Sequence, residues 1–525
     1  LDPFFLRTLL YVNILKGILE REAPSTVYAI GRTPVVSIAR FLAAKRGIDF
    51  QDKTGVGSGI LAQMASRGMM APYRTPYRSI SRYLLSLLPC CSKKVIFSEP
   101  KKRRRILFVG WIDRTVERLV AAAPMLREEM GADFHFLSVL RVSLTDSLRR
   151  AGFSCSYVHD WMKRKEGTAL MRTVDRAAAR GWDKIQKNEK LFSRHRWQGV
   201  PIFPYVAPVL KRSCLDGASF SSYFVEIAAR AIEQAQPDMV VCLEEWEIQR
   251  AITLLCRQKN IPTVAYNTLS GIAYDNVIRR SQDWMAVTGK VLYRGFEDQY
   301  KEKKERLCVI GDTLVDRAVL SSKEESRRKV CSDLGLSLNK PLVLLLSTYA
   351  TSPVTMKDIE ILFKKTAQAV KCIPGAQLII KTHPLQPAHD VRCWIKLWGC
   401  GAKVVDQYSL FSLCQAADIV SAPITSAVWQ AMLAKTPVVC IQHKELLEKY
   451  EGMGYDYLEN KGIFHISPTE DALPIFEKLI FDPKTRESQI QRGLKHAEEH
   501  MGPVDGQATQ RLVTFLNSIL TGSRA

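Results

Sequence analysis

The chain has 525 residues, which is more than one hydrophobic core usually holds, so we expect at least two domains. A composition of 46% hydrophobic and 24% charged residues excludes a mostly disordered chain, a collagen or a coiled coil, and no apolar run approaches the roughly 18 residues of a membrane span. The net charge of +22 indicates an anionic partner. The charge alone does not distinguish among nucleic acid, an anionic membrane and an acidic polymer.

The start of the chain is strongly basic and contains one half of an internal repeat. The first 105 residues carry 19 basic and 6 acidic side chains. Residues 24–30 match residues 237–243, and Ile48 matches Ile261, both at an offset of 213. Each copy reads helix–strand–helix–strand, the unit of a parallel sheet. We therefore expect residues 1–50 to complete the first Rossmann-like domain; a chance match between two such units is the alternative.

Residues 51–104 form a basic insertion or linker in which tyrosines, basic residues and leucines are interleaved. One interpretation is a segment that lies on an anionic membrane or binds an acidic acceptor. The other is a basic helix whose leucines pack in the protein core. The residues that would contact a membrane or an acceptor are Tyr73, Arg74, Tyr77, Arg78, Arg82, Lys93 and Lys94.

From residue 105 onward, predicted strands and helices alternate in two series. The first series has strands at 106–110, 134–139, 239–243, 263–266 and 284–287, with mostly helical, polar residues over 161–235. The second has strands at 308–310, 342–346, 377–381, 403–405, 419–421, 438–441 and 463–466. These series predict an α/β fold with two Rossmann-like domains facing across a cleft. We expect the acceptor-side domain over 105–290 and a nucleotide-sugar-binding domain over 300–525.

Polar residues follow several strands of the second series, at the sheet edge where open α/β sheets bind ligands. The first group is Gly311, Thr313 and Asp316, directly after the strand at 308–310. Glycine permits a sharp turn, and the hydroxyl and carboxylate can bind a ligand or cap the next turn. A purely structural turn is the alternative for this group.

The second group is Lys381-Thr382-His383-Pro384, after the strand at 377–381. A histidine at a strand end can bind a phosphate or donate a proton, and Lys381 adds positive charge. Pro384 favours an extended backbone at His383. A loop histidine without a ligand is the alternative. The pattern favours a phosphate site here.

The third group is Thr425-Ser426, ahead of a predicted helix at 428–433. Two hydroxyls beside free backbone N–H groups favour an anion site, and simple capping of the helix is compatible with it. Together with Lys381 and His383, these residues predict a phosphate-binding wall in the second domain.

The order of these motifs resembles the nucleotide-binding half of GT-B glycosyltransferases. The nearest group is bacterial surface-polysaccharide enzymes: polysialyltransferase-like and Kdo-transferase-like enzymes and CDP-glycerol glycerophosphotransferases. His383-Pro384 resembles their donor-phosphate motif, and Thr425-Ser426 resembles their paired serines. Gln430 stands where these enzymes often have a ribose-binding glutamate. The element from Gly311 to Asp316 resembles UDP-N-acetylglucosamine 2-epimerases, which share the fold.

An inverting transferase needs a base that takes the proton from the acceptor hydroxyl. Glu244 and Glu245 follow the strand at 239–243 and are the first candidates; a pair of acids favoured by a helix start is the alternative. Asp113, after the strand at 106–110, is the second candidate. No Asp-x-Asp triplet occurs, so we expect no metal and no cofactor, with the leaving phosphate stabilised by Lys381 and His383.

The sequence thus predicts a metal-independent glycosyltransferase that uses a CMP-, UDP- or CDP-linked sugar, peripheral to the cytoplasmic face of the inner membrane, in surface polysaccharide or glycolipid synthesis. Its expected partners are the donor, a glycan or lipid-linked acceptor and an anionic membrane surface. The alternatives are a sugar-nucleotide 2-epimerase and a non-catalytic relative that binds glycan or nucleotide. A nucleic-acid binder is disfavoured, because no nucleic-acid motif accompanies the charge.

Overall fold

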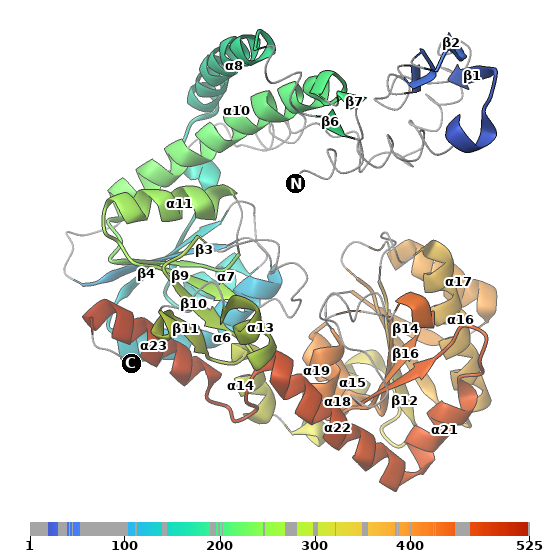
Figure 1. Cartoon of the computed structure of the whole chain (residues 1–525). Helices are drawn as coiled ribbons and strands as arrows, with labels where there is room; N and C mark the ends of the chain where they lie inside the picture. The colour runs from blue at the N-terminus through green and yellow to red at the C-terminus, as the bar shows by residue number, and fades with distance from the viewer. Residues whose placement is uncertain are drawn as a thin grey trace. The chain divides into compact units, whose positions relative to one another are not determined.

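Figure 1 shows a computed structural model of the chain. The structure describes residues 19–29, 39–40, 42–44, 46–52, 103–110, 113–138, 144–188, 196–197, 200–201, 203–244, 247–267, 281–297, 303–320, 322–348, 355–383, 386, 388–399, 401–406, 408–423, 425, 427–446 and 462–522. The predicted basic segment at 51–104 lies almost wholly outside these ranges, as do all seven of its proposed contact residues.

The chain divides into two compact units, one of residues 1–96 and 158–233, the other of residues 97–157 and 234–525. This division differs from the predicted domain over 105–290, because the helical stretch at 158–233 belongs to the first unit. The described residues between β5 (Ser154–Tyr157) and β8 (Met239–Cys242) supply two long helices and a pair of two-residue strands, β6 (Arg196–Trp197) and β7 (Val200–Pro201). No described strand of this stretch joins the large sheet.

The second unit contains a seven-stranded parallel sheet in the order β11-β10-β9-β8-β3-β4-β5. Alternate residues enter cores on opposite faces: Val264 and Tyr266 pack with α6 and α23, whereas Ala265 and Met285 pack with α13. Its elements are β3 (Arg105–Gly110), α6 (Asp113–Met130), β4 (Asp133–Ser138), α7 (Thr145–Arg150), β5 (Ser154–Tyr157), β8 (Met239–Cys242), α11 (Glu247–Gln258), β9 (Thr263–Asn267), β10 (Trp284–Val287), α13 (Lys290–Glu297), η2 (Lys304–Arg306), β11 (Leu307–Val309), α14 (Thr313–Leu320) and α23 (Ala508–Thr521).

Two parts of the predicted second domain belong to this first sheet. Strand β11 pairs with β10, through Ala286 and Cys308 among others, and is one of the sheet's two edge strands. The C-terminal helix α23 inserts Leu512 and Phe515 into the core around Phe108. The prediction that the second series begins at residue 308, within a domain over 300–525, is therefore wrong. Strand pairing and helix docking join segments far apart in the chain, which chain order does not reveal.

The second unit also contains a six-stranded parallel sheet in the order β14-β13-β12-β15-β16-β17. All five residues of β12 are buried, as expected for a central strand with helices on both faces. The strands are β12 (Leu342–Leu346), β13 (Gln377–Lys381), β14 (Ala402–Val405), β15 (Ile419–Ala422), β16 (Val438–Ile441) and β17 (Ile463–Ile466). The helices are α15 (Lys323–Leu334), α16 (Met356–Cys372), α17 (Ala388–Trp398), α18 (Leu410–Ala416), α19 (Val428–Leu433), α21 (Leu473–Phe481) and α22 (Pro483–Met501).

Local signals set several of these helix ends. Thr355 and Asp358 form a capping box at the start of α16. Ser322 caps α15, and Gly335 ends that helix in the left-handed conformation, with φ of 63°. The two sheets confirm the predicted α/β fold with two Rossmann-like domains.

The internal repeat is present in the backbone. Strands β1 (Thr26–Ala29) and β2 (Asp49–Asp52) form a parallel pair in which Val27 lies opposite Phe50. At an offset of 213, the pair β8–β9 places Val240 opposite Thr263, which is the same register. However, β1 and β2 form a two-stranded sheet of their own in the first unit. The described strands of the seven-stranded sheet come from other parts of the chain, and the prediction that residues 1–50 complete the first Rossmann-like domain stays a prediction.

The other described elements of the first unit are mostly helices. It contains η1 (Val158–Asp160), α8 (Arg164–Gln186), the short antiparallel pair β6 (Arg196–Trp197) and β7 (Val200–Pro201), and α10 (Phe203–Ala235), of which residues to 233 fall in this unit. Among the helices described, none is both long and apolar enough to cross a membrane.

Candidate functional site

Each large sheet reverses its strand order once, and predicted site residues lie at both reversals. In the seven-stranded sheet the reversal falls between the neighbouring strands β3 and β8. In the six-stranded sheet it falls between β12 and β15. Open α/β sheets bind ligands in the crevice at the carboxyl ends of the strands at such a reversal. The topology therefore singles out two strand-end positions among the many that the sequence offers.

Lys381 ends β13, beside β12, and its ammonium group is used within the protein. Its Nζ donates to the backbone oxygens of Asp406, at 2.8 Å, and Thr382, at 3.1 Å. Burial lowers the pKa of Lys381, and the Asp406 carboxylate opposes this shift. These contacts tie the loop after β13 to the end of β14. Lys381 thus braces this loop through two of its ammonium N–H groups, and its predicted phosphate contact stays a prediction.

The residues after Lys381 continue the same strand end. Thr382 is buried, and its Oγ1 donates to the Val405 oxygen at 3.4 Å. His383 is half-buried, and its backbone oxygen accepts the Gln386 N–H at 2.9 Å, so the chain turns back immediately after the histidine. The turn leaves His383 at the carboxyl edge of the sheet. Pro384, the fourth residue of the motif, lies outside the described residues.

On the other side of the reversal, Thr425 follows β15. Its Oγ1 accepts the N–H of Ala427 at 3.4 Å, as in a short local turn. Helix α19 has the predicted bounds but only six residues, and its N-cap, Ala427, makes no side-chain cap. Gln430 is half-buried in this helix. So short a helix adds little dipole, and any anion site here relies on Thr425 and backbone groups rather than on the helix. Ser426 lies outside the described residues.

Sequence reasoning missed the strand end at the centre of this reversal. Ser347 and Thr348 directly follow β12, which lies between β13 and β15. Ser347 is buried, and its N–H donates to the Lys381 oxygen at 3.0 Å. A signal was available, because two hydroxyl residues follow five consecutive apolar residues. The three neighbouring strand ends thus bring Thr348, His383 and Thr425 to one edge of the sheet.

The group from Gly311 to Asp316 lies in the seven-stranded sheet and has structural contacts. Gly311 adopts φ of 94°, and a Cβ there would lie 3.0 Å from the Ala508 Cβ, so the turn requires glycine. The Thr313 Oγ1 donates to the Arg118 oxygen at 2.9 Å. Both Asp316 carboxylate oxygens accept N–H groups at the start of α23. The structure therefore separates these residues from the strand ends around His383.

At the reversal of the seven-stranded sheet, Glu244 follows β8. Its Oε1 accepts from Thr115 Oγ1 on α6, and its Oε2 accepts from Gln249 Nε2 on α11 at 3.3 Å. A Cβ on Gly110 would lie 3.1 Å from Glu244 Oε2 and 2.8 Å from Leu243, so glycine is needed where β3 ends. The Glu244 side chain is 3% exposed. Its carboxylate thus joins β8 to two helices.

The side chains of the other two candidates for the base are not among those that the structure describes. Glu245 lies outside the described residues, and Asp113 begins α6 with a side chain outside the description. Within the described ranges, no group of three or more His, Cys, Asp and Glu side chains is placed to hold a metal ion. The expectation that no metal or cofactor is required stays a prediction.

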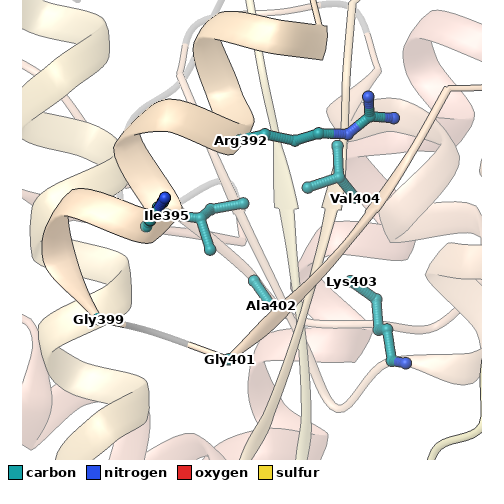
Figure 2. Close-up of a pocket in the computed structure, with 8 residues that line it drawn as sticks. Arg392, Ile395, Gly399, Gly401, Ala402, Lys403 and Val404 are labelled. Carbon is teal, nitrogen blue, oxygen red and sulfur yellow. The ribbon is translucent and has the colours of Figure 1, made fainter.

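A shallow cavity of about 480 Å³ lies along the exposed edge of the six-stranded sheet, between α17 and β14 (Figure 2). Three of its lining residues are basic: Arg392, Lys396 and Lys403. None of the predicted site residues lines it. We therefore treat it as a separate basic cluster.

No family model matches the chain, and no curated protein matches it. Solved structures do. The UDP-N-acetylglucosamine 2-epimerase of Neisseria meningitidis, bound to UDP-GlcNAc, aligns over 79% of this chain and 100% of its own, with 13% identity and a TM-score of 0.51. Staphylococcus aureus MnaA with UDP aligns over 80% and 97%, with 13% identity and a TM-score of 0.51. A Rickettsia africae glycosyltransferase covers 80% and 99%, with 10% identity and a TM-score of 0.47. At these identities the matches show the fold alone: the chain shares an arrangement of two Rossmann-like domains with the Neisseria meningitidis and Staphylococcus aureus proteins.

Proposed function

We propose that this protein is a metal-independent glycosyltransferase that takes a sugar from a CMP-, UDP- or CDP-linked donor. The observation that carries the proposal is the order of strands β13, β12 and β15 in the sheet. This order brings His383 and Thr425, the two motifs that resemble donor-phosphate ligands, to the same sheet edge on either side of the reversal. Open sheets of this kind bind nucleotides at that place.

Each residue at this edge has a role set by its contacts. His383 donates to the donor phosphate and stabilises the charge that develops as the nucleotide leaves. Thr425 and Thr348 supply hydroxyls to the same phosphate groups. Lys381 holds the loop that carries His383 through the Asp406 and Thr382 oxygens, and so acts as a positioning residue.

The acceptor hydroxyl needs a base, and the contacts of Glu244 favour its neighbour for that role. Glu244 is buried and accepts from Thr115 and Gln249, so a sugar hydroxyl has little access to it. We assign the base to Glu245. It takes the hydroxyl proton while the acceptor oxygen bonds to the anomeric carbon, and the bond from that carbon to the phosphate oxygen breaks. The nucleotide departs with the electron pair of that bond.

The acceptor is a surface glycan or glycolipid, and the enzyme acts peripherally at the cytoplasmic face of the membrane. The net charge of +22 supports this part of the proposal, since it favours anionic surfaces and polymers. The basic residues between 73 and 94 are the proposed membrane contacts.

The test measures free nucleotide released from CMP-, UDP- and CDP-sugars in the presence of membrane glycan extracts. Wild-type protein should release one nucleotide in step with sugar incorporation. Glu245→Gln should bind the donor normally but release at least about 100-fold less nucleotide, because proton transfer is lost. Glu233→Gln, an exposed acid on α10, is the matched control and should resemble wild type. Normal release by Glu245→Gln would remove Glu245 from the mechanism.

A sugar-nucleotide 2-epimerase is the second candidate, because the Neisseria meningitidis 2-epimerase shares the fold at a TM-score of 0.51. The same assay separates the two. A non-hydrolysing epimerase would convert the sugar while leaving it attached to the nucleotide. Such a product without glycan incorporation would replace the transferase proposal.

A further inference from the structure

Helices α8 and α10 of the first unit form an antiparallel pair whose register follows from three contacts. The Arg230 Nη1 lies 2.8 Å from Glu166 Oε2, and the Ser219 Oγ donates to Asp175 at 2.5 Å. Farther along α8, Asp183 lies 3.8 Å from Lys211 Nζ. As residue numbers rise along α8, the numbers of their contact residues in α10 fall, so the two helices are antiparallel.

Helix α8 packs on α10 closely through uncharged residues and directs its acidic side chains to the same partner. Trp182 is buried, and a Cβ on Gly167 would lie 3.0 Å from the Tyr223 ring, so the helices approach closely there. All three acidic residues within α8 are engaged by α10 through the contacts above. The acidic charge of α8 is therefore balanced within the helix pair.

The opposite face of α8 is basic and exposed. On a helix of 3.6 residues per turn, four cations of α8 and its C-cap residue Lys187 fall within about 80° of one another and extend over roughly 33 Å. Asp183, which lies 3.8 Å from Lys211 Nζ, is the one acid of α8 in the same arc. We call this set the α8 basic face: Lys165, Arg172, Arg176, Arg180 and Lys187, all exposed. Ala169, Thr173 and Ala177 lie between them and are also exposed, so the cations project from a smooth surface.

The cations of the α8 basic face are not neutralised by described acidic side chains and can therefore bind an external anion. Within the described ranges, no carboxylate pairs with any of its five members. Arginines at intervals of one turn, about 6 Å, repel one another, and a surface of this kind is stabilised when an anion neutralises it. Three of the five are arginines, whose planar guanidinium groups bind carboxylates and phosphates in a bidentate manner.

We propose that the α8 basic face binds a linear acidic polysaccharide that carries a carboxylate or phosphate in each short repeat. A straight row of cations matches a linear polyanion in shape and charge. The face has no large apolar side chain that could enter a bilayer, and no aromatic ring on which a nucleic-acid base could stack. The choice of a glycan rests on the proposed function, of which this polymer would be the acceptor.

The test compares two variants of equal charge. Arg172→Gln/Arg176→Gln/Arg180→Gln removes three charges from the α8 basic face, and glutamine keeps the helix propensity. Arg392→Gln/Lys396→Gln/Lys403→Gln removes three charges from the basic cavity in Figure 2. Circular dichroism and thermal unfolding check that both fold. The probes are fluorescent polygalacturonate, single-stranded DNA and vesicles of phosphatidylglycerol and phosphatidylcholine.

Wild-type protein and the cavity variant should bind polygalacturonate with equal affinity that weakens as salt rises. The α8 variant should bind it at least about tenfold more weakly and still bind nucleotide like wild type. Equal losses in both variants, or no loss in the α8 variant, would overturn the proposal. So would an α8-dependent preference for DNA or vesicles over polygalacturonate. Because nucleotide binding is measured separately, its absence would count against the proposed function and leave the polymer result intact.

Discussion

Asp316 caps a helix that begins 192 residues farther along the chain. Its Oδ1 accepts the N–H of Ala508 at 2.9 Å, and its Oδ2 accepts the N–H of Thr509 at 2.7 Å. These are the first two residues of α23, whose apolar face completes the core of the seven-stranded sheet. One carboxylate therefore joins the C-terminal helix to the first turn of α14.

Replacing this cap should loosen α23. Asp316→Ala leaves two buried N–H groups without their acceptor, and we expect a loss of about 2–3 kcal/mol in the free energy of unfolding. Asp316→Asn keeps one good acceptor and should lose less. Urea unfolding followed by tryptophan fluorescence measures both. An alanine variant as stable as wild type would contradict the capping role.

Arg118 and Asp312 form a buried ion pair between α6 and the turn before α14, with side chains 3% and 2% exposed. Burial disfavours the charged guanidinium, yet Asp312 raises the pKa of Arg118 above its ordinary value. Asp312→Leu alone should cost about 3–5 kcal/mol, because it leaves a buried charge unpaired. Arg118→Met/Asp312→Leu should cost clearly less than the sum of the single variants. Additive losses in urea unfolding would show that the pair does not couple.

His135 gives the stability a component that depends on pH. It lies buried on β4, and its ring contacts Ser154 Oγ at 2.7 Å and Ser156 Oγ at 2.6 Å. Burial lowers the pKa of His135 to about 4. The unfolded imidazole, with a pKa near 6.5, binds a proton first as pH falls.

The contribution of His135 is therefore fully present above pH 6.5 and is lost as pH falls toward 4, by up to about 3 kcal/mol. His135→Gln can bond both serines without titrating in this range. The difference between the urea midpoints of wild type and His135→Gln should stay constant above pH 7. Below pH 6 this difference should change, because only the wild type loses the contribution of His135. A difference that does not change with pH would refute this assignment.

Lys381 should act on nucleotide binding through His383. Lys381→Met removes the bonds to the Asp406 and Thr382 oxygens, and we expect donor affinity to fall about tenfold. In the double variant with His383→Ala, the loss should equal that of His383→Ala alone, because a displaced loop no longer matters once the histidine is absent. Additive losses would instead indicate that the Lys381 ammonium contacts the phosphate itself.

The strands of both sheets could be predicted from sequence because most of them are short, buried apolar runs. β12 and β10 have the predicted bounds, and the predicted helix at 428–433 is α19. The repeat at an offset of 213 even predicts a shared strand register. Each of these features depends on residues that are close in the sequence, so it could be predicted without knowledge of contacts between distant segments.

The pairing of β11 with β10 and the docking of α23 could not be predicted in this way, because both depend on contacts between distant segments. The same reason explains Asp316, which follows a strand end as a ligand residue would, yet bonds to α23. Lys381 shows the limit for a site: its residue type indicates a phosphate ligand, but the sequence does not reveal that it also bonds to two backbone oxygens and so braces the loop.

The most direct test of the central claim is calorimetric titration of CMP, CDP, UDP, UMP and GDP into wild-type protein, His383→Ala and His389→Ala. His389 is exposed on α17 and serves as the histidine control. We predict that one nucleotide binds wild type and His389→Ala with equal affinity and binds His383→Ala at least about tenfold more weakly. Binding unchanged by His383→Ala, or no binding of any nucleotide, would contradict a donor site at the strand ends around His383.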